Sequence, residues 1–249
     1  MLMLKILHCF VSGNGRGAAF DTSALPAQLA FAASASENDL FYRFHTSARG
    51  LNREAVALSR EDHGRNVMTA SCEAAIRRHL GKFAFSLSSS LHESVSGFMR
   101  RLAGATARVE RSVTGERVLT APELVAGDIV RLAPGDVVPA DVRLIEADGL
   151  SVNETALAGR ATVSRKNAER IFDADCAAQA ENLVFAGSIV VKGTATGIVV
   201  AVGEDVLLAR YSKKCILLAG NEISTAKPSP SREAASTPSA ILSQSRFTR

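Results

Sequence analysis

The sequence predicts an α+β fold, mainly β, in which helices precede a β domain. Two patterns support this prediction. Apolar residues recur at every third or fourth position from Ile76 to Leu102, which is the spacing of one helix face. From Arg108 onward the apolar period changes to two, and turn residues recur about every ten positions, as in all-β domains. With 47% hydrophobic residues among 249, the chain has enough apolar side chains for a sizeable core.

The part of the chain before the β domain divides into two segments. Residues 1–36 mix short apolar runs with Gly, Ser and Ala without a sustained period, and we expect them to be poorly ordered. Residues 37–105 are predicted to form a helical leader segment. Its first clear helix runs from Leu51 to His63, ends at Gly64, and has its apolar positions at Leu51, Ala55 and Leu58.

Residues 106–210 are predicted to form the β domain. Gly and Asp recur between its apolar runs and supply the backbone conformations that tight turns need. A short helix at 204–210 is expected to close the domain. The expected strands are 109–113, 117–119, 129–132, 142–147, 150–153, 183–185, 188–192 and 196–202.

The segment 211–249 differs in composition and in charge. It is rich in Ser, Pro and Ala, and such a segment cannot bury enough apolar surface to become ordered, so we expect a disordered tail. It holds six basic and two acidic residues, whereas residues 1–210 hold 23 of each. The net charge of +4 therefore belongs to the tail. Because the body has no basic excess, nucleic acid is not expected as a partner.

Cysteines and apolar runs indicate a cytoplasmic chain without a membrane span of its own. The cysteines at 9, 72, 176 and 215 form no C-x-x-C pair and no cluster at metal-ligand spacing, so no metal site is predicted. A membrane-spanning helix needs about 20 mostly apolar residues. The longest candidate run, Phe83 to His92, is much shorter and is bounded by Lys82 and Glu93.

Five ordered blocks resemble a known family. Three of them, ELVAGDIV, GD and VPAD, lie in the stretch from Glu123 to Asp141, which reads ELVAGDIVRLAPGDVVPAD. The fourth is VNETAL at 152–157, and the fifth consists of FAGS at 185–188 with VVKG at 190–193. These blocks resemble the actuator domain of P-type cation-transporting ATPases. The resemblance implies a distorted β-sandwich of the jelly-roll type. It also implies structural roles for Gly127, Asp128, Gly135, Asp136, Pro139, Ala140, Asp141, Glu154 and Gly187.

The leader segment narrows the resemblance to one subfamily. Asn38 to Phe41, Arg49 to Leu51 and Arg60 to Asn66 are similar to the cytosolic leader of magnesium-importing P-type ATPases. The match is short, and calcium-type pumps remain an alternative. The resemblance therefore implies a link to cation transport, with magnesium as the favoured ion.

One loop departs from the family at the point where its chemistry lies. In the family this loop reads Thr-Gly-Glu-Ser, and its glutamate acts on the water that hydrolyses the phosphorylated aspartate. The matching residues here are Ala158, Gly159, Arg160 and Ala161. A guanidinium cannot accept a proton from water at neutral pH. We therefore expect that this loop does not support dephosphorylation.

Larger departures concern the rest of the pump. The family inserts a membrane hairpin between leader and actuator domain, but residues 67–105 are interrupted by charges, so no hairpin is expected there. The phosphorylation motif Asp-Lys-Thr-Gly-Thr does not occur. We therefore expect no cofactor in this chain, although the family uses ATP and magnesium.

These departures leave three hypotheses for function. The first is a non-catalytic or regulatory actuator-domain protein that docks on an intact P-type ATPase. The second is one piece of a split ATP-driven pump that another chain completes, and Arg160 argues against it. The third is a decayed gene product without function.

Two residue patterns also have rival interpretations. The apolar stripe from Ile76 to Leu102 has basic neighbours and is compatible with a membrane surface, although packing against the β domain is favoured. Asp128, Asp136 and Asp141 could suggest a cation site. Single carboxylates in separate turns are more often turn formers, and we favour that role.

Overall fold

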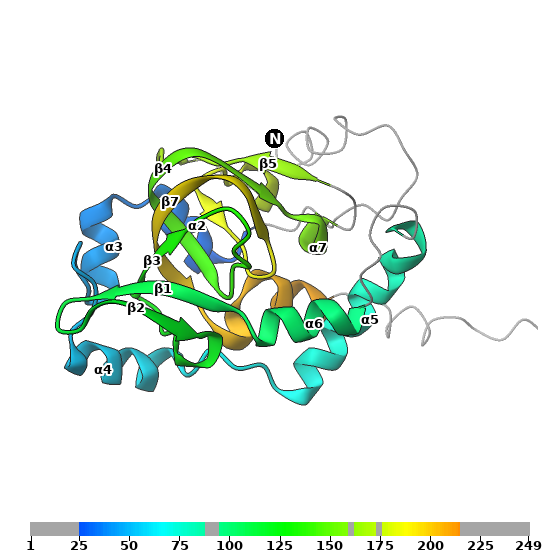
Figure 1. Ribbon diagram of the computed structural model, residues 1–249, viewed down its shortest axis with the longest axis horizontal. Helices are drawn as coiled ribbons and strands as arrows, with labels where there is room; N and C mark the ends of the chain where they lie inside the picture. The colour runs from blue at the N-terminus through cyan, green and yellow to red at the C-terminus, as the bar shows by residue number, and fades with distance from the viewer. Residues whose placement is uncertain (1–24, 88–94, 159–161, 173–175, 215–249) are drawn as a thin grey trace, which may run out of the picture.

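The computed structural model describes residues 25–87, 95–158, 162–172 and 176–214, in which helices surround one antiparallel sheet (Figure 1). The sheet is not closed into a barrel, and its strand order is β2-β1-β3-β7-β4-β5, with β6 paired to β4. The predicted α+β class and actuator-type sandwich are thus confirmed. The helices are α2 (Ala27–Ser34), α3 (Glu37–Arg43), α4 (Arg53–His63), α5 (Ala70–Leu87), α6 (Val95–Ala103), α7 (Thr155–Ala158) and an unlabelled helix over residues 207–214. The strands are β1 (Thr106–Arg111), β2 (Gly115–Thr120), β3 (Ile129–Leu132), β4 (Asp141–Asn153), β5 (Val163–Arg165), β6 (Leu183–Val184) and β7 (Ile189–Ala201).

Two long strands form the centre of the sheet, and they replace four shorter strands of the sequence prediction. β4 and β7 each continue for 13 residues and pair along their length as curved ribbons (Figure 1). The expected turn at Asp148-Gly149 is a bulge, where the pairing register shifts between Asp148 and Ser151. Opposite it, Gly193 has φ +77°, and a Cβ there would lie 2.4 Å from the Asp148 carbonyl oxygen. Glycine therefore bends the strands instead of ending them.

The sheet buries apolar side chains on both of its faces. Neighbouring residues of one strand point to opposite faces, and Ile198 and Val199 accordingly belong to two different core clusters. The first cluster also contains helical residues such as Leu29, Leu40 and Ile76, so the helices cover this face. The second lies among the strands and includes Val109. Apolar cores therefore cover both faces of the sheet, as in a sandwich.

Helix α2 corrects the expectation that residues 1–36 are poorly ordered. Within that segment, residues 27–34 form a helix that buries Leu29, Ala32 and Ala33 against the sheet. The Gln28 side chain also donates to the Val200 carbonyl oxygen of β7 at 2.5 Å. Sequence patterns missed α2 because it has no charged residue and no side-chain cap at Pro26. Residues 1–24 lie outside the described part of the chain.

Helix α4 ends at His63 as predicted, but it begins at Arg53 and not at Leu51. Asn52 caps its N-terminus by accepting from the Ala55 N–H at 2.7 Å, and Gly64 ends it with φ +76°. Leu58, one of its apolar residues, is 51% exposed. The neighbouring Ser59 is buried instead, where its hydroxyl donates to the Ala126 carbonyl oxygen at 2.6 Å. The hydrogen bond to the Ala126 carbonyl oxygen of the β domain therefore determines which face of α4 is buried.

The apolar stripe from Ile76 to Leu102 lies on two helices, α5 and α6, that pack against each other (Figure 1). Ile76, Leu80 and Leu102 belong to the core under the helical face of the sheet. This packing accounts for the stripe wherever its side chains are described, as the favoured interpretation expected. Within the described ranges, no helix is both long and apolar enough to span a bilayer.

The last described helix corrects the boundary at 210/211. It runs over residues 207–214, and Tyr211 and Ser212 are buried in it. The Ser212 hydroxyl donates to the Leu208 carbonyl oxygen at 2.7 Å. The ordered domain thus continues for four residues into the segment expected to be a disordered tail. The remainder of that segment, residues 215–249, lies outside the described chain.

Candidate functional site

The Gly127-Asp128 turn lies where the leader segment packs against the sheet. Asp128 is fully buried, accepts from the Val125 N–H at 3.0 Å, and forms a bidentate ion pair with Arg111 at 2.8 Å for both contacts. Gly127 has φ +92°, and a Cβ at this position would lie 2.8 Å from the Phe44 carbonyl oxygen. The turn therefore needs a glycine where the leader touches it and a carboxylate where the strand begins.

The Gly135-Asp136 turn is built locally. Asp136 accepts from the Ala133 N–H at 2.8 Å, which closes the turn, and from the Arg108 guanidinium at 2.7 Å. Gly135 has φ +91°, and a Cβ added to it would have no atom of the described residues within 4 Å. Its N–H donates to the Val190 carbonyl oxygen at 2.8 Å. Gly135 and Asp136 together fix how the loop after β3 meets β7.

The Pro139-Ala140-Asp141 block leads into β4. The Pro139 carbonyl oxygen accepts from the Asn66 side chain at 3.0 Å, and Ala140 is fully buried. Asp141 is also fully buried and accepts from the backbone N–H groups of Ala186 at 2.8 Å and Leu207 at 2.7 Å. Burial raises the pKa of Asp141 to about 7, although the two N–H donors oppose the shift. This carboxyl group therefore joins three separate segments.

Gly187 lies against Phe98 of helix α6. Its φ is +86°, and its N–H donates to the Val138 carbonyl oxygen at 2.8 Å. A Cβ at Gly187 would lie 2.8 Å from Cζ of Phe98 on α6. The glycine thus permits both the backbone conformation and the close approach of the helix.

Glu154 forms a buried ion pair at the end of β4. Its Oε1 lies 2.7 Å from Nζ of Lys166, and the two side chains are 8% and 2% exposed. The Lys166 ammonium also lies 5.4 Å from the centre of the Phe185 ring and donates to the Ala180 carbonyl oxygen at 3.4 Å. The sequence indicated a structural role for Glu154 but not for Lys166. Lys166 lies between residues 153 and 183, where no strand was expected.

The loop that resembles the family's catalytic loop connects β4 to β5. Both of its stems are fixed, because the Glu154 N–H donates to the Thr162 carbonyl oxygen at 3.0 Å and Asn153 pairs with Val163. Ala158 ends α7, and its N–H donates to the Glu154 carbonyl oxygen at 2.8 Å. Gly159, Arg160 and Ala161 lie outside the described residues. The structure therefore describes the base of this loop.

The three aspartates of the rival cation-site interpretation do not converge. Asp128, Asp136 and Asp141 each bind the backbone or arginine partners of a different turn. Across the described ranges, no group of three or more His, Cys, Asp or Glu side chains could hold a metal ion. Their geometry agrees with turn formation.

Sequence reasoning missed the polar groups that hold α2. The buried Arg143 guanidinium donates to the carbonyl oxygens of Ala32 at 2.8 Å, Ala168 at 3.3 Å, and Leu144. Burial lowers the pKa of Arg143 to about 10. Asn182 adds a bond to the Ala33 carbonyl oxygen at 2.8 Å. These donors satisfy the C-terminal carbonyl groups of α2, and no local pattern reveals them because they come from the β domain.

Comparisons with known proteins agree with the motif blocks. Residues 101–215 match the family model of the P-type ATPase actuator domain. The Probable cation-transporting ATPase F of Mycobacterium tuberculosis is 41% identical over 98 residues, which are 39% of this chain and 11% of that protein. The Calcium-transporting ATPase 1 of Schizosaccharomyces pombe is 39% identical over 92 residues, which are 37% of this chain and 10% of that protein.

A solved zinc-transporting PIB-type ATPase in the E2.Pi state aligns with 71% of this chain and 25% of its own, at 23% identity and a TM-score of 0.36. The chain spans about a tenth of the length of the curated relatives it matches. The family match covers the β domain together with the end of α6 and the helix at 207–214. Residues 101–215 thus match the actuator domain of P-type ATPases, and within this region the chain is similar to proteins named as cation-transporting ATPases.

Proposed function

We propose that this actuator domain acts through protein contacts and not through dephosphorylation chemistry of its own. It docks on a P-type cation ATPase and competes with the actuator domain of that pump. The observation that carries the proposal is Arg160, which stands where the family resemblance places the glutamate of the dephosphorylation loop.

The chemical argument rests on the charge at that position. Hydrolysis of a phosphorylated aspartate needs a group that orients and deprotonates the attacking water. Arginine carries only donors and stays protonated at neutral pH, so it cannot take that proton. The stems of the loop support the proposal, because Glu154 and Thr162 hold its base in a hydrogen-bonded position. The loop thus carries an arginine in place of the glutamate, while its stems keep their hydrogen bonds.

Magnesium is the ion we propose for the partner pump. Support comes from the leader residues that resemble the magnesium-importing subfamily. In the fold these residues dock the leader: Leu40 and Leu51 are buried, and Asn66 bridges Pro139 and Gly203. The leader blocks thus have a structural role on the β domain. We further propose that this chain uses no cofactor itself, and that ATP and magnesium belong to the partner.

The proposal is tested by adding the full chain to a magnesium-importing P-type ATPase whose own loop glutamate has been replaced. The decay of its phosphoenzyme is then followed. We expect no acceleration by the wild-type chain and a clear acceleration by the Arg160→Glu variant. Arg165→Glu is the matched control, because Arg165 is exposed at the end of β5 and lies outside the loop.

The outcomes separate the hypotheses. Acceleration by the wild-type chain would overturn the proposal and establish one piece of a split pump. Docking has its own measurement: the tagged chain should co-purify with a P-type ATPase from membranes of its native cell and lower ATP hydrolysis in a saturable manner. Absence of both effects would leave the decayed gene product as the remaining hypothesis. Repeating the inhibition with a calcium pump tests the choice of ion.

A further inference from the structure

The chain makes a corner at residues 203–207, between β7 and the helix at 207–214. The segment that leads into α5 passes directly beside this corner. The Gly203 N–H donates to Oδ1 of Asn66 at 2.8 Å. Gly203 has φ +58°, and a Cβ there would lie 2.8 Å from the Arg65 carbonyl oxygen. The two backbones therefore touch, although they are far apart in the sequence.

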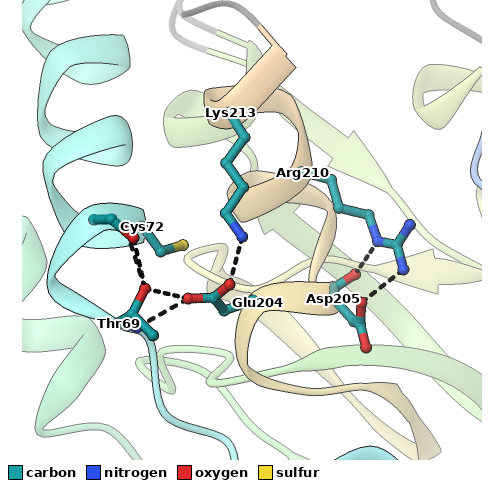
Figure 2. Close-up of polar contacts among 7 residues, drawn as sticks. Thr69, Cys72, Glu204, Asp205, Arg210 and Lys213 are labelled. Atoms are coloured by element: carbon teal, nitrogen blue, oxygen red, sulfur yellow. Dashed lines mark hydrogen bonds and ion pairs between the residues drawn. The ribbon is translucent and has the colours of Figure 1, made fainter. Parts of the chain in front are cut away.

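One carboxylate joins the two helices that start at this place (Figure 2). Oε1 of Glu204 accepts from the Thr69 N–H at 3.2 Å and from the Thr69 hydroxyl, while Oε2 accepts from Nζ of Lys213 at 2.5 Å. The Thr69 hydroxyl also accepts from the Cys72 N–H at 3.3 Å, in the first turn of α5. Glu204 thus contacts the start of α5 and, through Lys213, the helix at 207–214.

The charge of Glu204 is held in place by the same contacts. The Lys213 hydrogen bond, followed by that of Thr69, lowers the pKa of Glu204 to about 2. The carboxylate therefore stays ionised throughout the neutral range. A negative charge at the N-terminus of a helix also interacts favourably with the unpaired N–H groups there.

The neighbouring residue provides a contrast. Asp205 forms an ion pair with Arg210 at 2.7 Å, and Nε of Arg210 donates to the Asp205 carbonyl oxygen at 2.9 Å (Figure 2). These contacts begin and end within one short segment. Asp205 and Glu204 therefore have the same charge and the same neighbourhood, but the Glu204 carboxylate turns to α5 whereas the Asp205 carboxylate turns to Arg210.

We propose that Glu204 is a latch that holds the start of α5 to the helix at 207–214. With the latch closed, the segment that enters the β domain and the segment that leaves it move as one body. With the latch open, the start of α5 and the end of the outgoing helix fluctuate separately, while the sheet stays intact. This device goes beyond the docking function proposed above and does not depend on it.

Hydrogen exchange of the full chain, followed by mass spectrometry, tests the latch. In Glu204→Ala, amide exchange in residues 70–75 and 211–214 should become about fivefold faster or more, since the carboxylate that holds Thr69 at the start of α5 and the ion pair with Lys213 are lost together. Exchange in β4 should not change. In the control Asp205→Ala, residues 70–75 should exchange as in the wild type. Equal loosening of 70–75 by both variants, or none by Glu204→Ala, would overturn the latch.

A charge exchange separates the two halves of the latch. The double variant Glu204→Lys/Lys213→Glu restores an ion pair, but a lysine cannot accept from Thr69. Protection of residues 211–214 should therefore recover, while residues 70–75 should stay in fast exchange. Recovery of both segments would show that Thr69 has no part in holding α5, and the latch would be rejected.

Discussion

Glu154 and Lys166 form a buried ion pair between the two described stems of the segment that contains Arg160. Their contact of 2.7 Å joins the end of β4 to the residue that follows β5, so the pair ties together the two sides of the loop. The loop stems therefore depend on a charge pair as well as on the backbone ladder.

Removing the cation of this pair should destabilise the domain. Lys166→Met leaves the Glu154 carboxylate buried without its partner, so we expect the free energy of unfolding to fall by about 3 kcal/mol. Urea unfolding measures this change. Arg165→Met is the matched control, because Arg165 is exposed and its loss should cost less than about 0.5 kcal/mol. The double variant Glu154→Gln/Lys166→Met should recover part of the loss. A loss as small as that of the control would contradict the buried pair.

Asp141 should make stability depend on pH. Its pKa is raised to about 7 in the folded protein, so the folded state binds a proton that the unfolded chain has already released above about pH 4. The stabilisation is thus complete below pH 4 and is lost as the pH rises to 7. Asp141→Asn should remove this part of the slope. The variant should also be less stable at each pH, because one amide oxygen cannot replace both carboxylate acceptors.

Urea unfolding at several values between pH 4 and pH 8 measures this dependence. Asp205→Asn serves as the control, since this carboxylate is half exposed in its ion pair and lies outside the buried Asp141 site. An unchanged slope in Asp141→Asn would show that another group causes the dependence.

Gly187 and Gly135 allow two effects of glycine to be separated. Both have φ close to +90°, so an alanine at either position is strained by about 1 kcal/mol. At Gly187 a Cβ also meets a neighbour, the Phe98 ring at 2.8 Å, whereas at Gly135 it meets no described atom within 4 Å. Thermal unfolding should therefore show a larger loss of stability for Gly187→Ala than for Gly135→Ala. Adding Phe98→Ala to each variant should narrow the gap between them, and an unchanged gap would argue against the contact.

Local signals explain what the sequence predicted well. Gly64 marks the end of α4 through a bond to Arg60, within one helical turn, and Asp136 closes its own turn through Ala133. Such contacts depend on neighbours in the sequence, so the residue types reveal them. The expected strands 109–113 and 117–119 likewise overlap β1 and β2, which pair with each other across a short turn.

Distant contacts explain what the sequence did not predict. The carbonyl groups of α2 are bound by Arg143 and Asn182, which lie more than a hundred positions away. The same holds for Glu204, whose partner Thr69 is 135 positions distant. β4 was divided at Asp148-Gly149 because a glycine in a bulge looks like a glycine in a turn until the partner strand is known. In each of these examples, a contact between distant parts of the chain determines the local structure.

Helix α2 has a consequence for how the domain behaves in isolation. The core under the helical face joins Leu29 and Leu40 to Ile198 and Leu207, so it crosses the start of the family match at residue 101. A fragment cut at that residue would present part of an apolar sheet face to water. It would also leave the guanidinium of Arg143 without its bond to Ala32. Such exposed apolar faces promote self-association, and the fragment should therefore aggregate where the chain containing residues 25–100 does not.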